Sequence, residues 1–317
     1  MSAGETTFGS TVLRSARRAL QKPHISVCIC TYKRPDLLRR LLTRLDDQQA
    51  EGLFSYSLVI GDNDCLQSAR SVVEAFSAAS KLTVTYCVEP RQNIALMRNK
   101  VIEKASGEMI AFIDDDEFPT SDWLGNLLRT CIAHDVDGVL GPVRPYFDFD
   151  PPQWAKTGKF FERPAYKTGY RLDWRETRTG NVLFKRKILQ QVNIPFMPVF
   201  DSGGEDIDFF RRMIEKGFSF AWCNEAVVYE VVPRSRCTRT YLLKRALQRG
   251  SNFPKQSRDR VRNLSKSLIA VPCYALALPI LALFGQTVLL QYVIKLCDHT
   301  SRILGFLGLR LVPARQG

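Results

Sequence analysis

Two acidic motifs in this 317-residue chain have residue types and positions that could do chemistry. In the first, Asp114, Asp115 and Asp116 come directly after an uncharged apolar run, residues 109–113. Adjacent carboxylates repel one another and raise each other's pKa. A hard divalent cation, held by one or two carboxylates together with substrate phosphates, relieves that repulsion. The motif therefore predicts a metal site, the alternative being a solvated acidic turn.

The second motif is Gly203-Gly204-Glu205-Asp206. Two adjacent glycines let the backbone approach a bound ligand closely. The alternative is that the acids cap the following helix, where the helix dipole favours negative charge. Capping explains one acid well, but it does not explain two acids after a double glycine. The motif therefore indicates a second functional acidic site.

The elements that must position these motifs alternate between strand and helix. The hydrophobic pattern predicts strands over 24–30, 56–60, 82–88, 108–113, 138–143, 179–184 and 226–229, and helices over 37–45, 67–79, 94–105, 123–134, 186–191 and 205–216. Such alternation predicts an α/β fold with a mostly parallel sheet. Ligands of open α/β sheets bind beyond the carboxyl ends of the strands, where the triple aspartate falls. No GxGxxG follows the first strand, which disfavours a dinucleotide-dependent dehydrogenase.

The composition is that of a globular protein, with 45% hydrophobic and 24% charged residues. Nine cysteines without a CxxC pair, and only three histidines, indicate reduced thiols, neither a disulfide framework nor a zinc site. Residues 1–22 are expected to form a flexible basic leader, and they contain no secretory signal.

Much of the net charge of +13 lies near the C-terminus. Residues 234–266 contain eleven Lys or Arg and one acid, Asp259. Such a block suits either nucleic acid or an anionic membrane surface. Residues 267–294 follow without any charge, and a bilayer crossing needs about 20 apolar residues. We therefore expect membrane association through residues 236–317 and no nucleic-acid partner.

The form of the membrane association is left open by the sequence. Pro272, Pro279 and Gly285 interrupt the uncharged stretch, and basic residues flank it on both sides. The pattern favours a hairpin or an interfacial anchor over one clean crossing, and a buried helical pair is the alternative. The predicted organisation is a leader (1–22), a catalytic domain (23–235), a basic amphipathic juxtamembrane segment (236–266) and a hydrophobic tail (267–317).

Several strings of the chain resemble a known family. In order they are ISVCICTYKRPDLL, LVIGDND, RQNIALMRNKVIEKASGEMIAFIDDDEFP, TGNVLFKRKIL and GGEDIDFFRRMIEKG. They resemble the family 2 inverting glycosyltransferases, which have a GT-A fold, over roughly residues 24–250. Residues 231–236 and 241–246 look most like bacterial exopolysaccharide enzymes of the succinoglycan type.

The resemblance implies a UDP-sugar donor and a divalent metal, Mn²⁺ or Mg²⁺. The metal would neutralise charge on the leaving diphosphate. Asp116 is expected to be the direct metal ligand and Asp114 a ligand on the nucleotide side, and Asp115 could share either role.

Four further residues are expected in the nucleotide pocket by resemblance. Thr31 and Tyr32 would line it, Asp62 would accept a hydrogen bond from the uracil imide, and Arg98 would supply a basic contact. The alternatives are an ordinary turn at Asp62 and a solvated helical arginine at Arg98.

Attack by the acceptor hydroxyl requires a general base. By resemblance Asp206 is that base, and Glu205 binds a sugar hydroxyl. Glu230 is either a further metal ligand or a structural carboxylate paired with Arg234 or Arg236. The Q-x-x-R-W motif of processive synthases is absent, which favours addition of a single sugar.

The expected function is therefore transfer of one sugar, by default glucose, to a polyprenyl-diphosphate-linked oligosaccharide. This would occur at the cytoplasmic face of a bacterial inner membrane, in exopolysaccharide or cell-surface glycan biosynthesis. A nucleotidyltransferase acting on sugar phosphates is one alternative, but it predicts a Gly-rich phosphate loop that TYKRP lacks. The other alternative is a non-enzymatic basic protein that binds membrane or nucleic acid.

Overall fold

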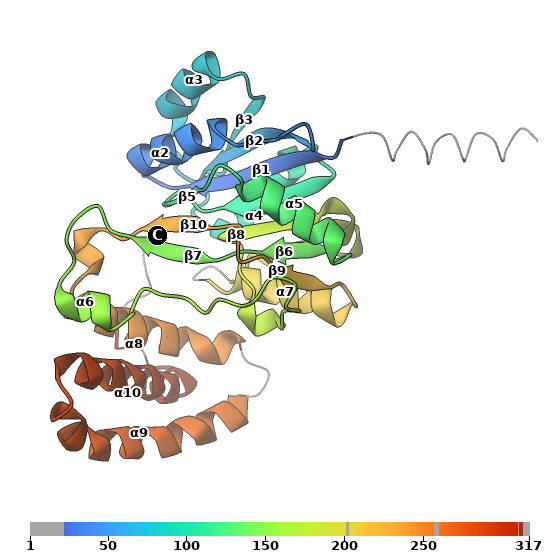
Figure 1. Cartoon of the computed structure of the whole chain (residues 1–317). Coiled ribbons are helices and arrows are strands. Elements are labelled where there is room, and N and C mark those ends of the chain that lie inside the picture. Colours follow the sequence, from blue (N-terminus) through green and yellow to red (C-terminus); the bar gives the residue numbers. More distant parts are fainter. Residues whose placement is uncertain (1–21, 201–202, 257–259, 310, 313–317) are drawn as a thin grey trace, which may run out of the picture.

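The computed structural model of the chain describes residues 22–200, 203–256, 260–309 and 311–312. The predicted leader therefore lies almost wholly outside the described residues. The elements form an α/β body and a layer of C-terminal helices on one side of it (Figure 1).

A seven-stranded sheet forms the centre of the body, in the order β3-β2-β1-β4-β8-β6-β9. Its strands are β1 (His24–Thr31), β2 (Ser55–Asp62), β3 (Val84–Val88), β4 (Met109–Ile113), β6 (Gly138–Leu140), β8 (Asn181–Lys185) and β9 (Phe220–Trp222). All pairings are parallel except those of β8, which is antiparallel to both neighbours. The predicted mostly parallel α/β sheet is thus confirmed.

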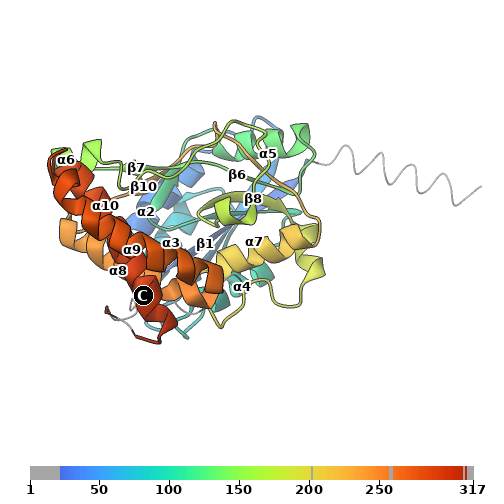
Figure 2. The same ribbon diagram turned by 90° about the horizontal axis from the view of Figure 1, so that it is seen from below.

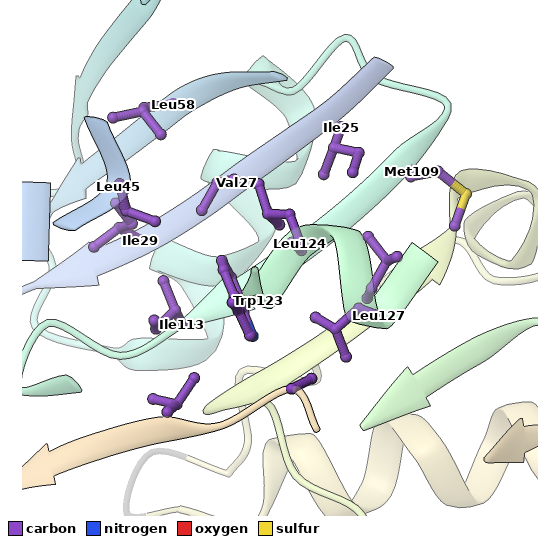
Figure 3. Packing of buried hydrophobic residues seen from close by; sticks show 14 of the residues in the cluster. Ile25, Val27, Ile29, Leu45, Leu58, Met109, Ile113, Trp123, Leu124 and Leu127 are labelled. Carbon is purple, nitrogen blue, oxygen red and sulfur yellow. The ribbon is translucent and has the colours of Figure 1, made fainter. Parts of the chain in front are cut away.

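Helices cover both faces of this sheet because the side chains of β1 alternate between two apolar clusters. Ile25, Val27 and Ile29 pack with residues of α2 (Pro35–Asp46), α3 (Arg70–Ala79) and α5 (Trp123–Ala133). Figure 3 shows these three side chains in one cluster with Leu45 of α2 and with Trp123, Leu124 and Leu127 of α5.

The opposite face of the sheet packs on two other helices. Cys28 belongs to the cluster formed with α4 (Ile94–Lys104) and α7 (Glu205–Glu215). The start of α4 is fixed by Asn93, whose side chain accepts hydrogen bonds from the backbone N–H groups of Ala95 (2.9 Å) and Leu96 (3.2 Å), as an N-cap does. These two helices carry Arg98 and the second acidic motif.

A smaller sheet lies at the carboxyl edge of the main one. It contains β5 (Glu117–Pro119), β10 (Val228–Val231) and β7 (Val143–Tyr146), in the order β5-β10-β7. In the antiparallel pairing of β10 with β5, Glu230 lies opposite Glu117. The sequence placed Glu230 at the end of the last strand, and in the structure β10 ends one residue later, at Val231.

The remaining short elements are α6 (Gln153–Thr157) and three 3₁₀ helices, η1 (Trp174–Glu176), η2 (Arg186–Gln191) and η3 (Arg234–Arg236). The predicted helix over 186–191 is thus a 3₁₀ helix, a tighter form that suits short connectors.

Three long helices end the described chain: α8 (Arg239–Gln256), α9 (Arg260–Ala282) and α10 (Gln286–Phe306). Helix α10 packs between α8 and α9 and also contacts α6. Figures 1 and 2 show this layer on one side of the body, with α9 farthest from the sheet. One stretch of α9, Asn263–Ala282, is long and apolar enough to cross a membrane.

Candidate active site

The triple aspartate lies where β4 ends, next to the end of β1. Asp115 is buried and accepts hydrogen bonds from the Thr31 hydroxyl (2.8 Å) and Arg34 Nη1 (2.9 Å). Arg34 Nη1 also contacts Asp116 Oδ2 at 3.3 Å. Arg236 Nη2 reaches the same oxygen at 3.3 Å. Arg34, which the sequence did not assign to the site, and Arg236, which it named only as a partner of Glu230, thus balance Asp115 and Asp116.

Arg98 joins the two acidic motifs. It lies on α4 with 9% of its side chain exposed, and its Nη1 donates to Glu205 Oε1. Its Nη2 lies 3.8 Å from Asp114 Oδ1. Glu205 is the first residue of α7, and its side chain is 4% exposed. Residues far apart in the sequence therefore meet around one buried guanidinium.

Burial raises the pKa of two acids at this junction. The pKa of Glu205 rises to about 7 because its carboxyl is buried, and the charge of Arg98 opposes the shift. The pKa of Asp114 rises to about 6, first through loss of hydration and then through Asp116 and Asp115, again opposed by Arg98. Because 45% of the Asp114 side chain remains exposed, that carboxylate is accessible to a ligand.

A second group of charges surrounds β5 and β10. Glu117 is buried, and its Oε2 accepts a hydrogen bond from the Asp114 N–H (3.1 Å), while its Oε1 has no hydrogen-bond partner among the described residues. Arg163 bonds Glu230 and lies 4.0 Å from Glu117 Oε1. Arg236 Nη1 donates to Glu230 Oε1 (3.1 Å). Glu230 is thus paired with Arg236, one of the two partners predicted for a structural carboxylate.

Asp206 differs from its neighbour Glu205. It is half-buried, and its Oδ1 accepts a hydrogen bond from the Ile207 N–H (2.8 Å). Within the described ranges it has no ion-pair partner at 4.0 Å or less. The carboxylate of Asp206 therefore forms no ion pair with Arg98, which bonds Glu205, although the charge of Asp206 acts on Arg98 from nearby.

Arg178 is a cation close to this acid. It is half-buried, and burial together with the charge of Arg163 lowers its pKa, while Asp206 and Glu117 oppose that shift. Arg178 forms no hydrogen bond or ion pair with the part of the chain that the structure describes. A positive charge near Asp206 that forms no ion pair within the described ranges suits an anionic group of a substrate.

Asp62 and Tyr32 lie at the same edge of the sheet. The Asp62 carboxylate is buried and accepts from the N–H groups of Asp64 (3.0 Å) and Ala69 (2.8 Å) and from the Tyr86 hydroxyl (2.9 Å). It therefore shapes the loop after β2, and its predicted contact with a nucleotide base stays a prediction. Tyr32 is half-buried directly after β1.

The residues present fit a divalent cation that shares its ligands with substrate. Among the described residues no group of three His, Cys, Asp or Glu side chains could enclose a metal by itself. Metal sites in phosphate-transfer enzymes typically use only one or two carboxylates plus phosphates. A Cβ added to Gly180 would lie 2.8 Å from Glu117 Oε1 and 3.1 Å from Asp114 Oδ2. Two acid oxygens, one without a hydrogen bond, thus border this glycine.

The site residues that the sequence missed are Glu117 and three arginines, Arg34, Arg163 and Arg178, while Arg236 was expected only as a partner of Glu230. Arg34 stands in TYKRP, three residues after Thr31 and two after Tyr32, and this closeness to predicted pocket residues is a usable signal. Arg163 and Arg178 come from the irregular segment between β7 and β8, where no periodicity predicts direction.

Comparison with known proteins defines the class. Residues 26–192 match the model of glycosyl transferase family 2. The chain is 30% identical over 305 residues to the succinoglycan biosynthesis protein ExoM of Rhizobium meliloti, covering 90% of this chain and 94% of that protein. It is 24% identical to the glycosyltransferase AglE of Haloferax volcanii, covering 65% and 66%.

Solved structures share the fold. The mannosyltransferase PcManGT of Pyrobaculum calidifontis, in complex with GDP-Man and Mn²⁺, is 19% identical, with a TM-score of 0.61 over 95% of this chain and 94% of that one. S. aureus TarS 1–349 in complex with UDP-GlcNAc is 15% identical, with a TM-score of 0.52 over 93% and 97%.

The chain therefore belongs to glycosyltransferase family 2, and it is a glycosyltransferase with a GT-A fold. The predicted family, its succinoglycan-type relationship and the enzyme class are thus confirmed.

Proposed function

We propose that this enzyme transfers a single sugar from a UDP-sugar, glucose by default, with inversion and with Asp206 as the general base. One observation carries the proposal. Arg98 brings the two acidic motifs together at the carboxyl edge of the sheet, and there the Asp206 carboxylate forms no ion pair with any residue that the structure describes. An acid without a bound cation can accept the proton of an acceptor hydroxyl, whereas Glu205 is already engaged by Arg98. Glu205 is then better suited to bind a sugar hydroxyl.

Binding of the donor would use the residues at the ends of the first strands. Thr31 and Tyr32 line the pocket, Asp62 contacts the base, and Arg98 provides positive charge near the diphosphate. TarS has been solved with UDP-GlcNAc and PcManGT with GDP-Man, which supports a nucleotide-sugar donor in this fold. Asp62, as an acceptor for the uracil imide, favours UDP.

Asp116 and Asp114 would hold the divalent ion, Mn²⁺ or Mg²⁺, with Asp115 close by. When bound, the ion supplies positive charge for the leaving diphosphate. The Mn²⁺ of PcManGT supports this assignment. Arg34 and Arg236 form ion pairs with Asp115 and Asp116.

The acceptor is proposed to be a polyprenyl-diphosphate-linked oligosaccharide at the cytoplasmic face of the bacterial inner membrane. Similarity to a succinoglycan biosynthesis protein supports a role in exopolysaccharide synthesis, and the apolar helix α9 supports a place at the membrane. Arg178, beside Asp206, is suited to bind an anionic part of the substrate pair.

A donor panel tests this function. Full-length protein in detergent is mixed with Mn²⁺, lipid-linked oligosaccharide extracted from bacterial membranes, and one labelled sugar nucleotide at a time. We expect transfer from a UDP-sugar, UDP-glucose first, and a product linkage of opposite anomeric configuration to the donor. Retention of configuration, or transfer only from GDP-sugars or dTDP-sugars, would contradict the proposal.

Gly180→Ala is expected to weaken Mn²⁺-dependent UDP binding by at least about tenfold. The new methyl group would stand 2.8 Å from Glu117 Oε1 and 3.1 Å from Asp114 Oδ2, in the space where a cation would meet these acids. Isothermal calorimetry measures the change. Gly125→Ala is the matched control, because its Cβ would meet only the flexible Arg129 guanidinium (3.1 Å). Equal UDP affinity in both variants would argue against metal binding at this place.

A further inference from the structure

The outward face of α9 is apolar without interruption. Six large apolar side chains on α9 and the turn after it are exposed: Leu268, Ile269, Leu276, Ile280, Leu283 and Phe284. Leu276 is 78% and Leu283 85% exposed. No charged residue lies between Ser267 and Ile294. A continuous apolar face of this kind marks a contact with lipid or protein.

The opposite side of α9 is fixed against α10. The Ser267 hydroxyl lies 3.0 Å from His299 Nδ1, and the rings of Tyr274 and Tyr292 lie 5.7 Å apart. As the contact positions rise along α9 they fall along α10, so the two helices run antiparallel in one register. This pairing leaves only the apolar face of α9 uncovered.

Helix α10 is in turn held lengthwise along the body. Near its start Gln286 accepts a hydrogen bond from Arg239 (2.6 Å), and Gln291 donates to the Gly158 carbonyl (3.1 Å). Further along, Asp298 pairs with Arg249 (2.5 Å). Because these contacts follow α10 from its first residue to its middle, α10 and its partner α9 lie along the base of the body (Figure 2).

This arrangement disfavours a membrane crossing by α9. If α9 crossed while paired with α10, Lys295, Asp298 and His299 of α10 would enter hydrocarbon, which is costly. In addition, Pro272 and Pro279 lack the N–H that would bond the carbonyls of Leu268 and Ala275 four positions back. In the hydrated interface water can satisfy such carbonyls, whereas in a spanning helix neighbouring helices, side chains or local backbone adjustments must do so.

Charge identifies the partner of the face as anionic lipid. Residues 239–312 contain twelve Lys or Arg and only two acids. Lys266 is exposed at the N-terminal end of the apolar face. One of the two acids, Asp298, is neutralised by its ion pair with Arg249. Anionic headgroups attract basic residues that lie next to an exposed apolar face.

We propose that the enzyme is monotopic: the outward face of α9 inserts into one leaflet of an anionic membrane, parallel to its plane, while α10 connects it to the catalytic body. This inference rests on the proposed membrane association and specifies its geometry. The active site then stays at a fixed side of the membrane, with the layer of α8 and α10 between it and the lipid (Figure 1).

Two native cysteines test the depth of α9. Cys273 and Cys65 are the exposed thiols of the described chain, and Cys273 lies near the middle of the 20-residue stretch Asn263–Ala282. A polarity-sensitive fluorophore is attached to Cys273 in the C65S protein, and to Cys65 in the C273S protein as the control. Both are mixed with phosphatidylglycerol-containing vesicles that carry a spin label near the headgroups or near the bilayer centre.

We expect the Cys273 probe to be quenched more strongly by the shallow spin label, and the Cys65 probe by neither. Stronger quenching by the central label would mean that α9 crosses the bilayer, which overturns the proposal. Two other results would also overturn it. One is flotation with the vesicles without quenching of the Cys273 probe, and the other is a dimer that does not bind vesicles. Calorimetric UDP binding to the same samples is independent, so failure of the donor site is distinguished from failure of the membrane geometry.

A matched pair of variants gives a second readout. Ile280 on α9 is 62% exposed, and Ile132 on α5 is 69% exposed. Ile280→Glu is expected to lower vesicle partitioning by at least about tenfold, because a large apolar contact is replaced by a charge. Ile132→Glu should leave partitioning unchanged. Equal partitioning of the two variants would contradict insertion of the α9 face.

Discussion

Replacing Asp206 with asparagine is expected to slow sugar transfer by about 10²- to 10⁴-fold, the usual contribution of a general base. Asparagine can keep the hydrogen bond from the Ile207 N–H that Asp206 Oδ1 accepts (2.8 Å), so the start of α7 should be preserved. The variant loses only the capacity to accept a proton. UDP affinity, measured by calorimetry, should therefore stay close to that of the native enzyme.

Two comparisons make this result specific. Asp36→Asn applies the same chemical change to an acid of α2 whose side chain is 88% exposed, and it should leave transfer unchanged. Glu205→Gln should mainly raise the KM for a sugar substrate. Glu205 is paired with Arg98 and is proposed to bind a sugar hydroxyl, not to accept the proton. If Glu205→Gln abolished turnover and Asp206→Asn did not, the two roles would have to be exchanged.

Replacing Arg98 with methionine is expected to lower the free energy of unfolding by about 3–5 kcal/mol, as removal of one partner of a buried ion pair does. Both side chains of the Arg98–Glu205 pair are almost fully buried. Without Arg98, Glu205 has no cation, and Asp114 loses the charge that lies 3.8 Å away. Urea denaturation followed by tryptophan fluorescence measures the loss.

The loss of unfolding free energy in Arg98→Met should grow as the pH rises. Burial already raises the pKa of Glu205 to about 7 from its ordinary 4.5, so the folded protein binds a proton that the unfolded chain releases. The contribution of Glu205 to stability therefore falls as the pH rises from 4.5 through about 7, the pKa of Glu205 in the folded protein. Because Arg98 opposes this shift, its removal raises the pKa of Glu205 further and extends the fall to higher pH.

The double variant Arg98→Met/Glu205→Met is the control, since removing both charges leaves no unpaired acid. It should recover most of the lost stability at about pH 8, where the single variant is weakest. A single variant as stable as the native protein at that pH would show that the pair does not hold the two motifs together.

Much of the fold could be predicted from the sequence because the relevant signals are local. The apolar run before Asp114 predicts strand β4, and the leucine spacing predicts helix α2. The alternation of strands with helices predicts the mostly parallel sheet. The weaker predictions fall on short elements: the helix over 186–191 is a 3₁₀ helix, and β10 begins at Val228 and ends at Val231, one residue after the predicted end.

The acids of the site were visible in the sequence, but their partners were not. Asp114 and Glu205 stand in recognisable motifs, whereas the joining role of Arg98 depends on how α4 and α7 pack on the same face of the sheet. Arg163 and Arg178 lie in a segment without periodicity, and only the pairing of β5 with β10 brings the first of them to Glu117. Long-range packing of this kind leaves no trace in residue spacing.

The most direct test of the site is calorimetric titration of UDP into the full-length protein, with and without Mn²⁺, repeated on Asp116→Ala. Asp36→Ala serves as the control for loss of an acid elsewhere. Binding that requires Mn²⁺ and is lost in Asp116→Ala but kept in Asp36→Ala is the predicted result. UDP binding that is indifferent to Mn²⁺ and to Asp116, or no binding of UDP at all, would contradict a metal-dependent UDP-sugar site at the triple aspartate.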